Sequence, residues 1–366
     1  MTSRRDFLKG GTAAALATGI VFCGCGLQRA LHAQPAGVRS LPVAIGGKRV
    51  RTIDVHAHVI FREAAALLDP KEAETLTPPI NFAQKAYIDA VDERLKAMDA
   101  QAVDMEVLSI NPFWYGKDRD LAAKIVKVQN EKLAELTARK PDRFAAFASL
   151  TLQAPDLAVT ELETAVKKQG LKGAAIGDAV DGMAFSDPKF HPVWAKAEEL
   201  GVPLFIHPLG IPELNKRLAG NGWLLNTIAN PLGTTIALSH LIFEGTLDRY
   251  PGLKIIGAHG GGYLPSYADR SDHPCFVGPC DPSIKLKKKP TENLRQLYFD
   301  SLVFTPEAIR HLVATVGADQ IVLGSDYPYD WAPHPVDHIF ACDSLDDGQK
   351  AAVLGNTAAR ILNLSS

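Results

Sequence analysis

The chain has 366 residues, of which 46% are hydrophobic and 22% are charged, and its formal net charge is −2. This composition is typical of a globular protein with a sizeable core, and it excludes a generally disordered chain. The near-neutral charge also argues against nucleic-acid binding. The one long basic run, Lys285 to Lys289, ends at Pro290 and is typical of a solvated loop.

The N-terminus has the features of a transport signal. Residues 3–9, SRRDFLK, form a twin-arginine motif, and a weakly apolar stretch rich in glycine and alanine follows from Gly10 to Phe22. That stretch is too short and too rich in glycine for a stable membrane span. Leu31 to Ala33 offer a cleavage site with a small residue, so we expect residues 1–33 to be a signal peptide. It would direct the folded protein to the periplasm or beyond.

The cysteines leave two questions open. Cys25 could accept a lipid anchor as an alternative to simple cleavage, although Phe22 to Gly24 are a poor match to a lipoprotein signal. The expected mature chain keeps Cys275, Cys280 and Cys342, and an exported compartment permits a disulfide. Cys275 and Cys280 are close enough in sequence to form one, but an odd number leaves at least one cysteine free or paired elsewhere.

Residues 34–48 predict an extended arm, and from residue 53 onward apolar runs typical of strands alternate with segments of helical period. The expected strands are Ile53–Ala57, Met105–Ile110, Phe144–Leu150, Gly173–Ile176, Pro203–His207, Lys254–Ala258, Leu297–Ser301 and Ile321–Ser325. The expected helices include Tyr87–Asp99, Leu121–Arg139, Leu157–Gln169, Pro192–Leu200, Gly233–Arg249, Pro306–Val316 and a closing helix, Asn356–Leu364.

Strand and helix alternate about eight times, which predicts a single α/β domain over residues 49–366 with the architecture of a closed (β/α)8 barrel of the TIM type. A doubly wound open sheet is the alternative. It is disfavoured because no G-x-G-x-x-G motif follows the first strand, where a dinucleotide-binding fold would carry one.

Polar side chains stand just beyond the ends of the apolar runs, where a barrel enzyme carries its active site. His56 and His58 end the first strand, and their spacing of two places both on one side of it. His207 ends the fifth run, His259 the sixth and Asp326 the eighth. We therefore expect these five side chains to meet on one rim of the barrel rather than to face water separately.

Three imidazoles and one carboxylate would surround one divalent ion if His56, His58, His207 and Asp326 converge, with positions left open for water or substrate. Such a set suits zinc best and tolerates manganese, iron or cobalt. Two-metal barrels of this kind carry a bridging lysine at the end of the fourth strand, whereas Lys172 stands at its beginning. The sequence therefore predicts a single ion.

His259 would be a free imidazole beside that ion. Histidine is the residue type that exchanges protons near neutral pH, so His259 is a candidate catalytic acid or base. Asp326 is a second candidate, because a carboxylate that binds a metal through one oxygen keeps the other.

The sequence resembles the amidohydrolase superfamily, in the branch that contains aminocarboxymuconate-semialdehyde decarboxylase and the aromatic-acid decarboxylases. The resemblance covers most of residues 50–364 and implies a metal-dependent barrel that removes CO2 from an aromatic or unsaturated acid without redox chemistry, with a dimer as the suggested assembly. It implies that the four residues named above are the ligands and that His259 is the catalytic histidine. The motifs that carry it are DVHAH (54–58), FIHP (205–208), LKIIGAHGGG (253–262), FDS (299–301) and LGSDYP (323–328).

Candidate substrate contacts are weaker signals. Arg270 stands where the family often has an arginine, whose neighbourhood in some members reaches into a partner subunit's pocket, and the fork of donors on an arginine matches a carboxylate. A surface arginine is the alternative. Trp114, Tyr115 and Trp331 fall in loops after the second and eighth strands and would line an apolar pocket, with ordinary packing as the alternative.

The chain departs from the semialdehyde decarboxylase pattern in its arginines. The loop over residues 63–85 has none, and Gly278 occupies the place of another. These differences argue against the same dicarboxylate substrate.

Two other functions would use the same residues. The first is hydrolysis of an ester, lactone or amide by metal-bound hydroxide, with His259 and Asp326 as proton carriers. The second is a non-catalytic binding protein, which the intact set of expected ligands disfavours. Fold alone cannot separate these alternatives from decarboxylation.

Overall fold

Parallel strands occupy the centre of the structure, and each corresponds to an apolar run of the sequence. The computed structural model describes residues 41–76, 86–220, 222–274, 286–329 and 331–364, and residues 39–366 group into one unit. Its central strands are β3 (Ile53–His58), β4 (Met105–Ser109), β5 (Phe144–Ala146), β6 (Ala174–Ile176), β7 (Pro203–Ile206), β8 (Lys254–Gly257), β9 (Tyr298–Asp300) and β10 (Ile321–Val322).

The strands pair in chain order around a ring. Strands β3 to β5 form a three-stranded sheet and β6 to β10 a five-stranded sheet, with every neighbouring pair parallel. An isolated parallel bridge between Ala148 and Ala174 joins the two sheets on one side, and another between Asp54 and Leu323 joins the first strand to the last. The predicted (β/α)8 barrel is therefore confirmed, and the open-sheet alternative is wrong.

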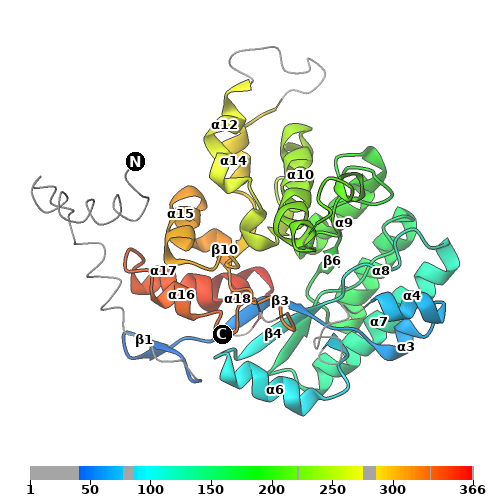
Figure 1. Ribbon diagram of the computed structural model, residues 1–366, viewed down its shortest axis with the longest axis horizontal. Coiled ribbons are helices and arrows are strands. Elements are labelled where there is room, and N and C mark those ends of the chain that lie inside the picture. Colours follow the sequence, from blue (N-terminus) through cyan, green and yellow to red (C-terminus); the bar gives the residue numbers. More distant parts are fainter. Residues whose placement is uncertain (1–40, 77–85, 221, 275–285, 330, 365–366) are drawn as a thin grey trace, which may run out of the picture. The chain divides into compact units, whose positions relative to one another are not determined.

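Helices lie around these strands, as Figure 1 shows for α7, α8, α9, α10 and α15. The carboxylate of Asp118 caps α7 by accepting hydrogen bonds from two main-chain N–H groups, and Gly170, with φ of 74°, ends α8 in the left-handed conformation. The longer helices are α6 (Val91–Ala100), α7 (Arg119–Arg139), α8 (Pro155–Gln169), α9 (His191–Leu200), α10 (Asn230–Phe243) and α15 (Pro306–Val316).

Shorter helices connect these elements. They are α3 (Arg62–Ala65), α4 (Pro70–Thr75), α11 (Thr246–Arg249), α12 (Ala268–Asp272), α14 (Pro290–Leu294), α16 (Asp337–Phe340), α17 (Asp347–Ala351) and α18 (Thr357–Ile361). The 3-10 turns are η1 (Pro188–Phe190), η2 (Pro212–Leu214), η4 (His259–Gly261), η5 (Pro265–Tyr267) and η6 (Ala318–Gln320), and the π-helical turns are η3 (Leu225–Ala229) and η7 (Ala352–Asn356).

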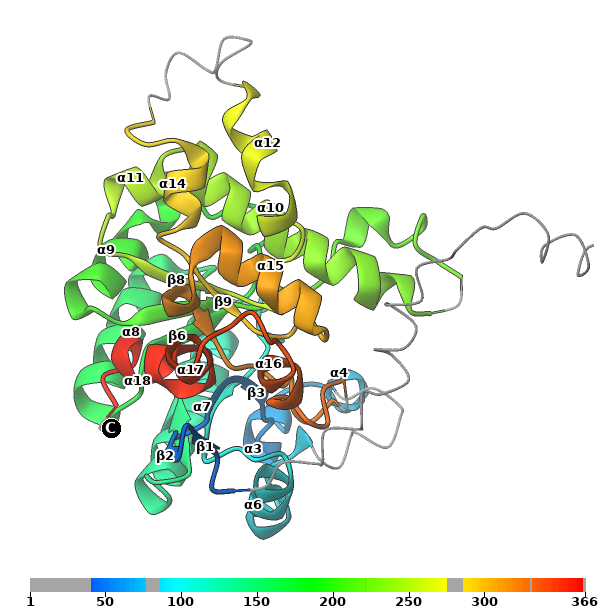
Figure 2. The same ribbon diagram turned by 90° about the vertical axis from the view of Figure 1, so that its left-hand side faces the viewer.

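Several elements differ from the sequence-based expectation at their ends, since β5 stops at Ala146, β10 at Val322, and α6 begins at Val91. Two segments differ more. The arm before the barrel is not extended to its end, because β1 (Ala44–Ile45) and β2 (Lys48–Arg49) form an antiparallel hairpin around two glycines with positive φ. The helix expected over Gly233–Arg249 starts earlier, since η3 runs directly into α10, and it breaks at Gly245, where φ is 75°. Figure 2 shows the green segment before α10 projecting to one side of the strands.

Alternation along the strands divides the apolar side chains between two layers. Phe205 of β7 belongs to a cluster inside the barrel together with Val55 and Val107, whereas its neighbour Leu204 belongs to the larger cluster that includes the helices. Ile361 of α18 joins the inner cluster. These apolar residues fill the barrel, and polar side chains occupy the C-terminal ends of its strands.

Candidate metal centre

Four predicted ligands come together at the C-terminal ends of the strands. His56 and His58 belong to β3, His207 follows β7, and Asp326 lies beyond β10. One ligand atom from each residue can be chosen so that all lie within 4.8 Å of one another, and all four residues are buried. Among the described residues, this is the one group of histidine, cysteine and carboxylate side chains with such a geometry.

A β-bulge turns both histidines of β3 inward. The register with β4 shifts between Asp54 and Ala57, so two residues of β3 stand opposite one residue of β4. Val55 faces the inner cluster, and strict alternation from it would turn His56 and His58 outward. The extra residue reverses the alternation, and both imidazoles reach the inside of the barrel.

Hydrogen bonds at Nδ1 aim both of these imidazoles at the centre. His56 Nδ1 lies 2.7 Å from the carboxylate of Asp300, and His58 Nδ1 lies 3.1 Å from Ser109 Oγ, whose hydroxyl also lies 3.2 Å from a main-chain carbonyl. In the neutral imidazoles, with the proton on Nδ1, each Nε2 would present a lone pair to an ion. These two Nε2 atoms are 3.1 Å apart, and they lie 3.1 and 2.9 Å from Asp326 Oδ1.

The charges at this point favour a cation. Burial lowers the pKa of His56, but the carboxylates of Asp326 and Asp300 outweigh it and raise that pKa to about 10. Burial lowers the pKa of His58 and takes that of His207 well below its usual value, so these two imidazoles are neutral, as metal ligands must be. His207 Nδ1 is buried without a hydrogen-bond partner. Convergent lone pairs, an orphaned nitrogen and a demand for positive charge all fit a divalent metal ion.

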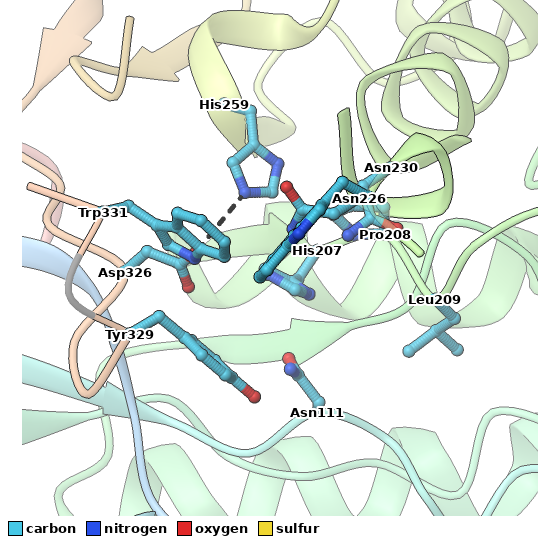
Figure 3. A pocket seen from close by; sticks show the side chains of 11 residues that line it. Asn111, His207, Pro208, Leu209, Asn226, Asn230, His259, Asp326, Tyr329 and Trp331 are labelled. Atoms are coloured by element: carbon cyan, nitrogen blue, oxygen red, sulfur yellow. Dashed lines mark ion pairs between the residues drawn. The ribbon is translucent and has the colours of Figure 1, made fainter. Parts of the chain in front are cut away.

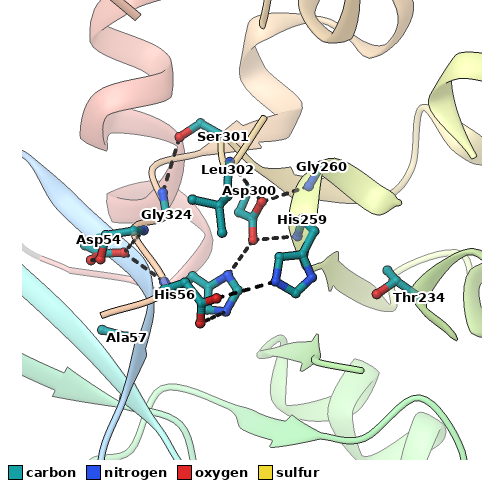
Figure 4. A network of polar contacts seen from close by, with 12 residues as sticks. Asp54, His56, Ala57, Thr234, His259, Gly260, Asp300, Ser301, Leu302 and Gly324 are labelled. Carbon is teal, nitrogen blue, oxygen red and sulfur yellow. Dashed lines mark hydrogen bonds and ion pairs between the residues drawn. The ribbon is translucent and has the colours of Figure 1, made fainter. Parts of the chain in front are cut away.

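Asp300 connects the ligand set to the loop that carries His259. Its Oδ2 lies 2.7 Å from His56 Nδ1 and accepts the N–H of His259 at 2.9 Å, while its Oδ1 accepts the N–H groups of Gly260 at 2.8 Å and Leu302 at 3.1 Å (Figure 4). Burial raises the pKa of Asp300, but the bond and the charge of His56 outweigh it and lower that pKa. The ionised carboxylate therefore orients one ligand and one catalytic candidate together.

His259 lies beside the four ligands in a tight turn. Its Nε2 is 3.7 Å from Asp326 Oδ2, a distance from which a small movement makes a hydrogen bond. Both residues have a left-handed backbone, with φ of 54° at His259 and 62° at Asp326, a conformation that residues other than glycine adopt rarely. Gly262 must stay small, because a Cβ there would come within 2.0 Å of the carbonyl oxygen of Pro231.

A cavity of about 360 Å³ opens over this group. Figure 3 shows His259, Asp326 and His207 on its walls, with side chains from the loops after β4, β7 and β10 around them. The lining residues are Asn111, His207, Pro208, Leu209, Trp223, Asn226, Asn230, His259, Asp326, Tyr329 and Trp331. The cavity is large enough for a single substituted aromatic ring.

Of the three aromatic residues predicted to contact substrate, one lines the cavity and two do not. Trp331 lines the cavity, and its ring meets that of Trp223 edge to face with centroids 5.5 Å apart. Trp114 does not reach the cavity, because its side chain is fully buried and its indole N–H donates to the carbonyl of Leu150 at 2.8 Å. Tyr115 is not among the lining residues, and its ring lies close to Gly177.

Arg270 also lies apart from this cavity. It is exposed on α12 and lines a separate surface depression with Tyr267, Arg295 and His311. The part of the chain that the structure describes places no arginine or lysine on the wall of the cavity above the ligands.

Sequence reasoning missed several residues of the site. Asp300 lies in the FDS motif and ends the seventh strand, so its position at a strand end is the signal that could have found it. Asn111, Asn226 and Asn230 line the cavity, and asparagine in a loop or helix gives no signal that separates it from a capping or solvent-facing residue.

The structure leaves other expectations as they were. The signal peptide, Cys25, Cys275 and Cys280 lie outside the described residues, and Cys342 is buried and free. Within the described ranges, helices long and apolar enough to cross a membrane are absent.

Comparisons with known proteins identify relatives. Residues 53–364 match the amidohydrolase family model, and residues 1–20 match the signal sequence of the twin-arginine translocation pathway. The chain is 31% identical over 277 residues to 2-amino-3-carboxymuconate-6-semialdehyde decarboxylase of Dictyostelium discoideum, which covers 75% of this chain and 76% of the relative. It is 31% identical over 293 residues to gamma-resorcylate decarboxylase of Rhizobium radiobacter, over 77% of this chain and 89% of the relative.

A solved structure supports the same relationship. The dihydroxybenzoic acid decarboxylase of Polaromonas sp. JS666, solved with bound manganese and the inhibitor 2-nitroresorcinol, superposes with a TM-score of 0.73 at 25% identity. The superposition covers 86% of this chain and 97% of that chain.

Proposed function

This chain belongs to the amidohydrolase family, and from that premise we propose that it is a metal-dependent decarboxylase of aromatic carboxylic acids that works without redox chemistry. The observation that carries the proposal is a shared wall: His207 and Asp326, two of the four convergent candidate ligands, and His259, which lies beside Asp326, line the same ring-sized cavity. The relatives that the chain resembles are decarboxylases, which favours this reaction over the hydrolase alternative.

We propose His56, His58, His207 and Asp326 as the residues that hold one divalent ion. When bound, the ion supplies positive charge that orients the acid and stabilises the negative charge that develops as the bond to CO2 breaks. The imidazole-rich set favours zinc, whereas manganese is the ion in the Polaromonas structure. Metal analysis of the protein as purified, followed by activity after reloading with each ion, decides between them.

We propose that His259 and Asp326 carry the proton. In the reaction, the bond between the ring and its carboxylate breaks, the electron pair stays on the ring carbon, and a proton replaces the CO2 that leaves. His259 Nε2 lies 3.7 Å from Asp326 Oδ2, so a proton can pass between the two groups after a small approach. Trp331 at the cavity wall supplies an apolar surface for the ring and excludes water.

The test is anaerobic release of CO2 from aromatic acids, with 2,6-dihydroxybenzoate as the first probe. We expect activity to disappear after dialysis against a chelator and to return with zinc or manganese. In D2O, one deuterium should appear at the carbon that loses CO2. His259→Asn should lower kcat by about 10² to 10⁴ while the metal content stays the same, whereas His311→Asn, on an exposed part of α15, should not lower it.

Hydrolysis would contradict the proposal. If acids were inert and an ester or lactone took up ¹⁸O from solvent water, the hydrolase alternative would replace it. Decarboxylation that persisted without metal would contradict the role of the ligand set.

The matched signal sequence directs export through the twin-arginine pathway. We propose cleavage after Ala33, a barrel domain over residues 49–366, a location in the periplasm and a homodimer in which Arg270 approaches the partner's cavity. Mass determination of the exported protein tests the cleavage and would reveal a lipid at Cys25. Light scattering tests the dimer, and Arg270→Ala should raise KM if the arginine holds substrate.

A further inference from the structure

A second cavity adjoins the candidate metal centre. It has a volume of about 310 Å³ and is lined mainly by residues from the segments after β3, β4 and β10. His58 lines this second cavity, whereas His207 and Asp326 line the cavity of about 360 Å³ described above, the first cavity. Ligand atoms of these three residues lie within 4.8 Å of one another, so both cavities reach the same group of candidate ligands.

Three side chains form the boundary between the two cavities. Asn111, Leu209 and Tyr329 line both of them. Figure 3 shows these three on the side of the first cavity that lies away from His259. Leu209 is 43% exposed, and an exposed side chain changes its rotamer within nanoseconds. A molecule bound at the candidate ligands can therefore extend from the first cavity past this boundary into the second.

The wall of the second cavity is suited to a hydrocarbon group. Most of its lining residues are apolar, and they include Ile60, Leu76, Ile110 and Phe113. The described lining residues include no lysine, arginine, aspartate or glutamate. Ile60 and Phe113 are half-buried, so an apolar group bound there would remove further apolar surface from water, which is favourable. A charged group would instead lose its hydration without gaining a partner.

The position of His58 indicates where such a group branches from the substrate. In the proposed reaction the carboxylate end of the acid lies at the candidate ligands, and the ring lies in the first cavity beside Trp331. The second cavity begins at the same ligands, because His58 is part of its wall. The ring carbon next to the carboxylate is therefore the point from which a substituent enters it most directly.

We propose that the second cavity is a subsite for a hydrocarbon chain, and that the enzyme acts on aromatic acids that carry a chain of several carbons next to the carboxylate. The inference rests on the proposed decarboxylase function and extends it, since it assigns a ligand to a cavity that the reaction itself does not use. The first cavity holds the ring, and the second holds the chain.

The experiment compares two acids on the metal-loaded enzyme, 2-hydroxy-6-methylbenzoate and 2-hydroxy-6-pentylbenzoate. Both crowd the carboxylate alike, so a difference between them reports on the additional carbons of the longer chain. We expect kcat/KM to be about tenfold or more higher for the pentyl acid, because the chain is buried against apolar side chains. Equal values, or a preference for the methyl acid, would overturn the inference.

Two substitutions that fill the second cavity test where the chain binds. Ile60 and Ala86 line this cavity but not the first. In Ile60→Phe and Ala86→Phe, the ratio of kcat/KM between the pentyl and methyl acids should fall to about one or below. A ratio is measured on one protein preparation, so partial loss of folded enzyme does not change it. An unchanged ratio in both variants would show that the chain lies elsewhere and would contradict the inference.

Ile236→Phe is the matched control, because Ile236 is 41% exposed on α10 and lines neither cavity. It makes the same change of side chain as Ile60→Phe. We expect it to keep the ratio of the unaltered enzyme. Loss of the ratio in this variant would show that the preference does not depend on the second cavity.

A binding measurement separates this inference from the proposed function. Calorimetry with 3-pentylphenol and 3-methylphenol reports on the chain without any chemistry. We expect the pentyl compound to bind about tenfold more tightly, with the difference lost in Ile60→Phe. If neither acid releases CO2 but this difference holds, the proposed reaction is wrong and the subsite stands. If CO2 is released but the difference is absent, the reaction stands and the subsite is wrong.

Discussion

The guanidinium of Arg94 donates a hydrogen bond to the main-chain carbonyl of His58 at 2.9 Å. The same buried group donates to Glu106 at 2.5 Å and lies 4.6 Å from the ring centre of Tyr327, the residue after the candidate ligand Asp326. One side chain of α6 thus contacts the backbone of one candidate ligand, from the first strand, and the neighbour of another, beyond the last strand. We conclude that Arg94 holds the two sides of the candidate metal centre in register.

Removal of Arg94 should loosen the metal centre. Arg94→Met leaves the buried carboxylate of Glu106 without its partner, and we expect a loss of about 3 kcal/mol in the free energy of unfolding. We also expect the affinity for the divalent ion to fall about 10- to 100-fold, measured by competition with a chromophoric chelator. Arg310→Met, an exposed change on α15, is the control. An unchanged ion affinity in a destabilised Arg94 variant would limit the residue to a structural role.

Asp300 should matter more for activity than for folding. Asp300→Asn keeps the shape but removes the negative charge that orients His56 and accepts the N–H groups of His259 and Gly260. We expect kcat or metal affinity to fall about 10- to 100-fold. Steady-state kinetics at saturating metal separates the two, and Asp319→Asn, at an exposed position, serves as the comparison. Full activity in Asp300→Asn would refute the orienting role.

Metal binding should release a proton. The carboxylates of Asp326 and Asp300 raise the pKa of His56 to about 10 in the metal-free protein, so this side chain is a positively charged imidazolium at pH 7. The ion needs the neutral form, and its affinity should therefore rise with pH until His56 loses its proton at about pH 10. Titration calorimetry in buffers of different ionisation enthalpy should give about one proton released per ion at pH 7. Release of none would contradict the charge balance described for the site.

Asp178 should make the stability of the folded protein depend on pH in the acid range. Burial raises its pKa from 3.8 to about 6, and its carboxylate accepts the N–H of Leu209 at 3.2 Å. Between those two pH values the folded state binds more protons than the unfolded state, so stability falls as pH rises from about 4 to 6. In Asp178→Asn this contribution, on the order of 2 kcal/mol, should be absent. Urea unfolding of both proteins at pH 4, 5, 6 and 7 measures it, and parallel curves would count against it.

The sequence predicted the strands because parallel strands buried on both faces appear as uninterrupted apolar runs. Even β10, which pairs over only Ile321 and Val322, stood out in this way. Strand ends then predicted which side chains converge, since a barrel gathers those ends at one rim. The bulge that turns His56 inward was not predictable, because it depends on register with β4 rather than on the residues of β3 alone.

The sequence did not predict the roles of residues whose function depends on their tertiary contacts. Arg94 lies in a helix whose sequence resembles a solvated surface, and its burial follows from the position of Glu106 on the neighbouring strand. Trp114 lies in a loop after a strand, a position that predicted a place in the pocket. Its indole N–H instead donates a hydrogen bond to the buried main-chain carbonyl of Leu150. Loop shape decided these cases, and the amino-acid pattern does not specify loop shape.

Closure of the barrel can occur only after nearly all of the chain has been synthesised. Asp54 pairs with Leu323, and the main-chain carbonyl of His56 accepts the N–H of Asp326 at 2.8 Å, so the seam that completes the candidate metal centre joins segments about 270 residues apart. Almost the entire polypeptide must leave the ribosome before these two segments can pair. A chain that ends before Asp326 therefore lacks the fourth candidate ligand, however well its first strands have folded.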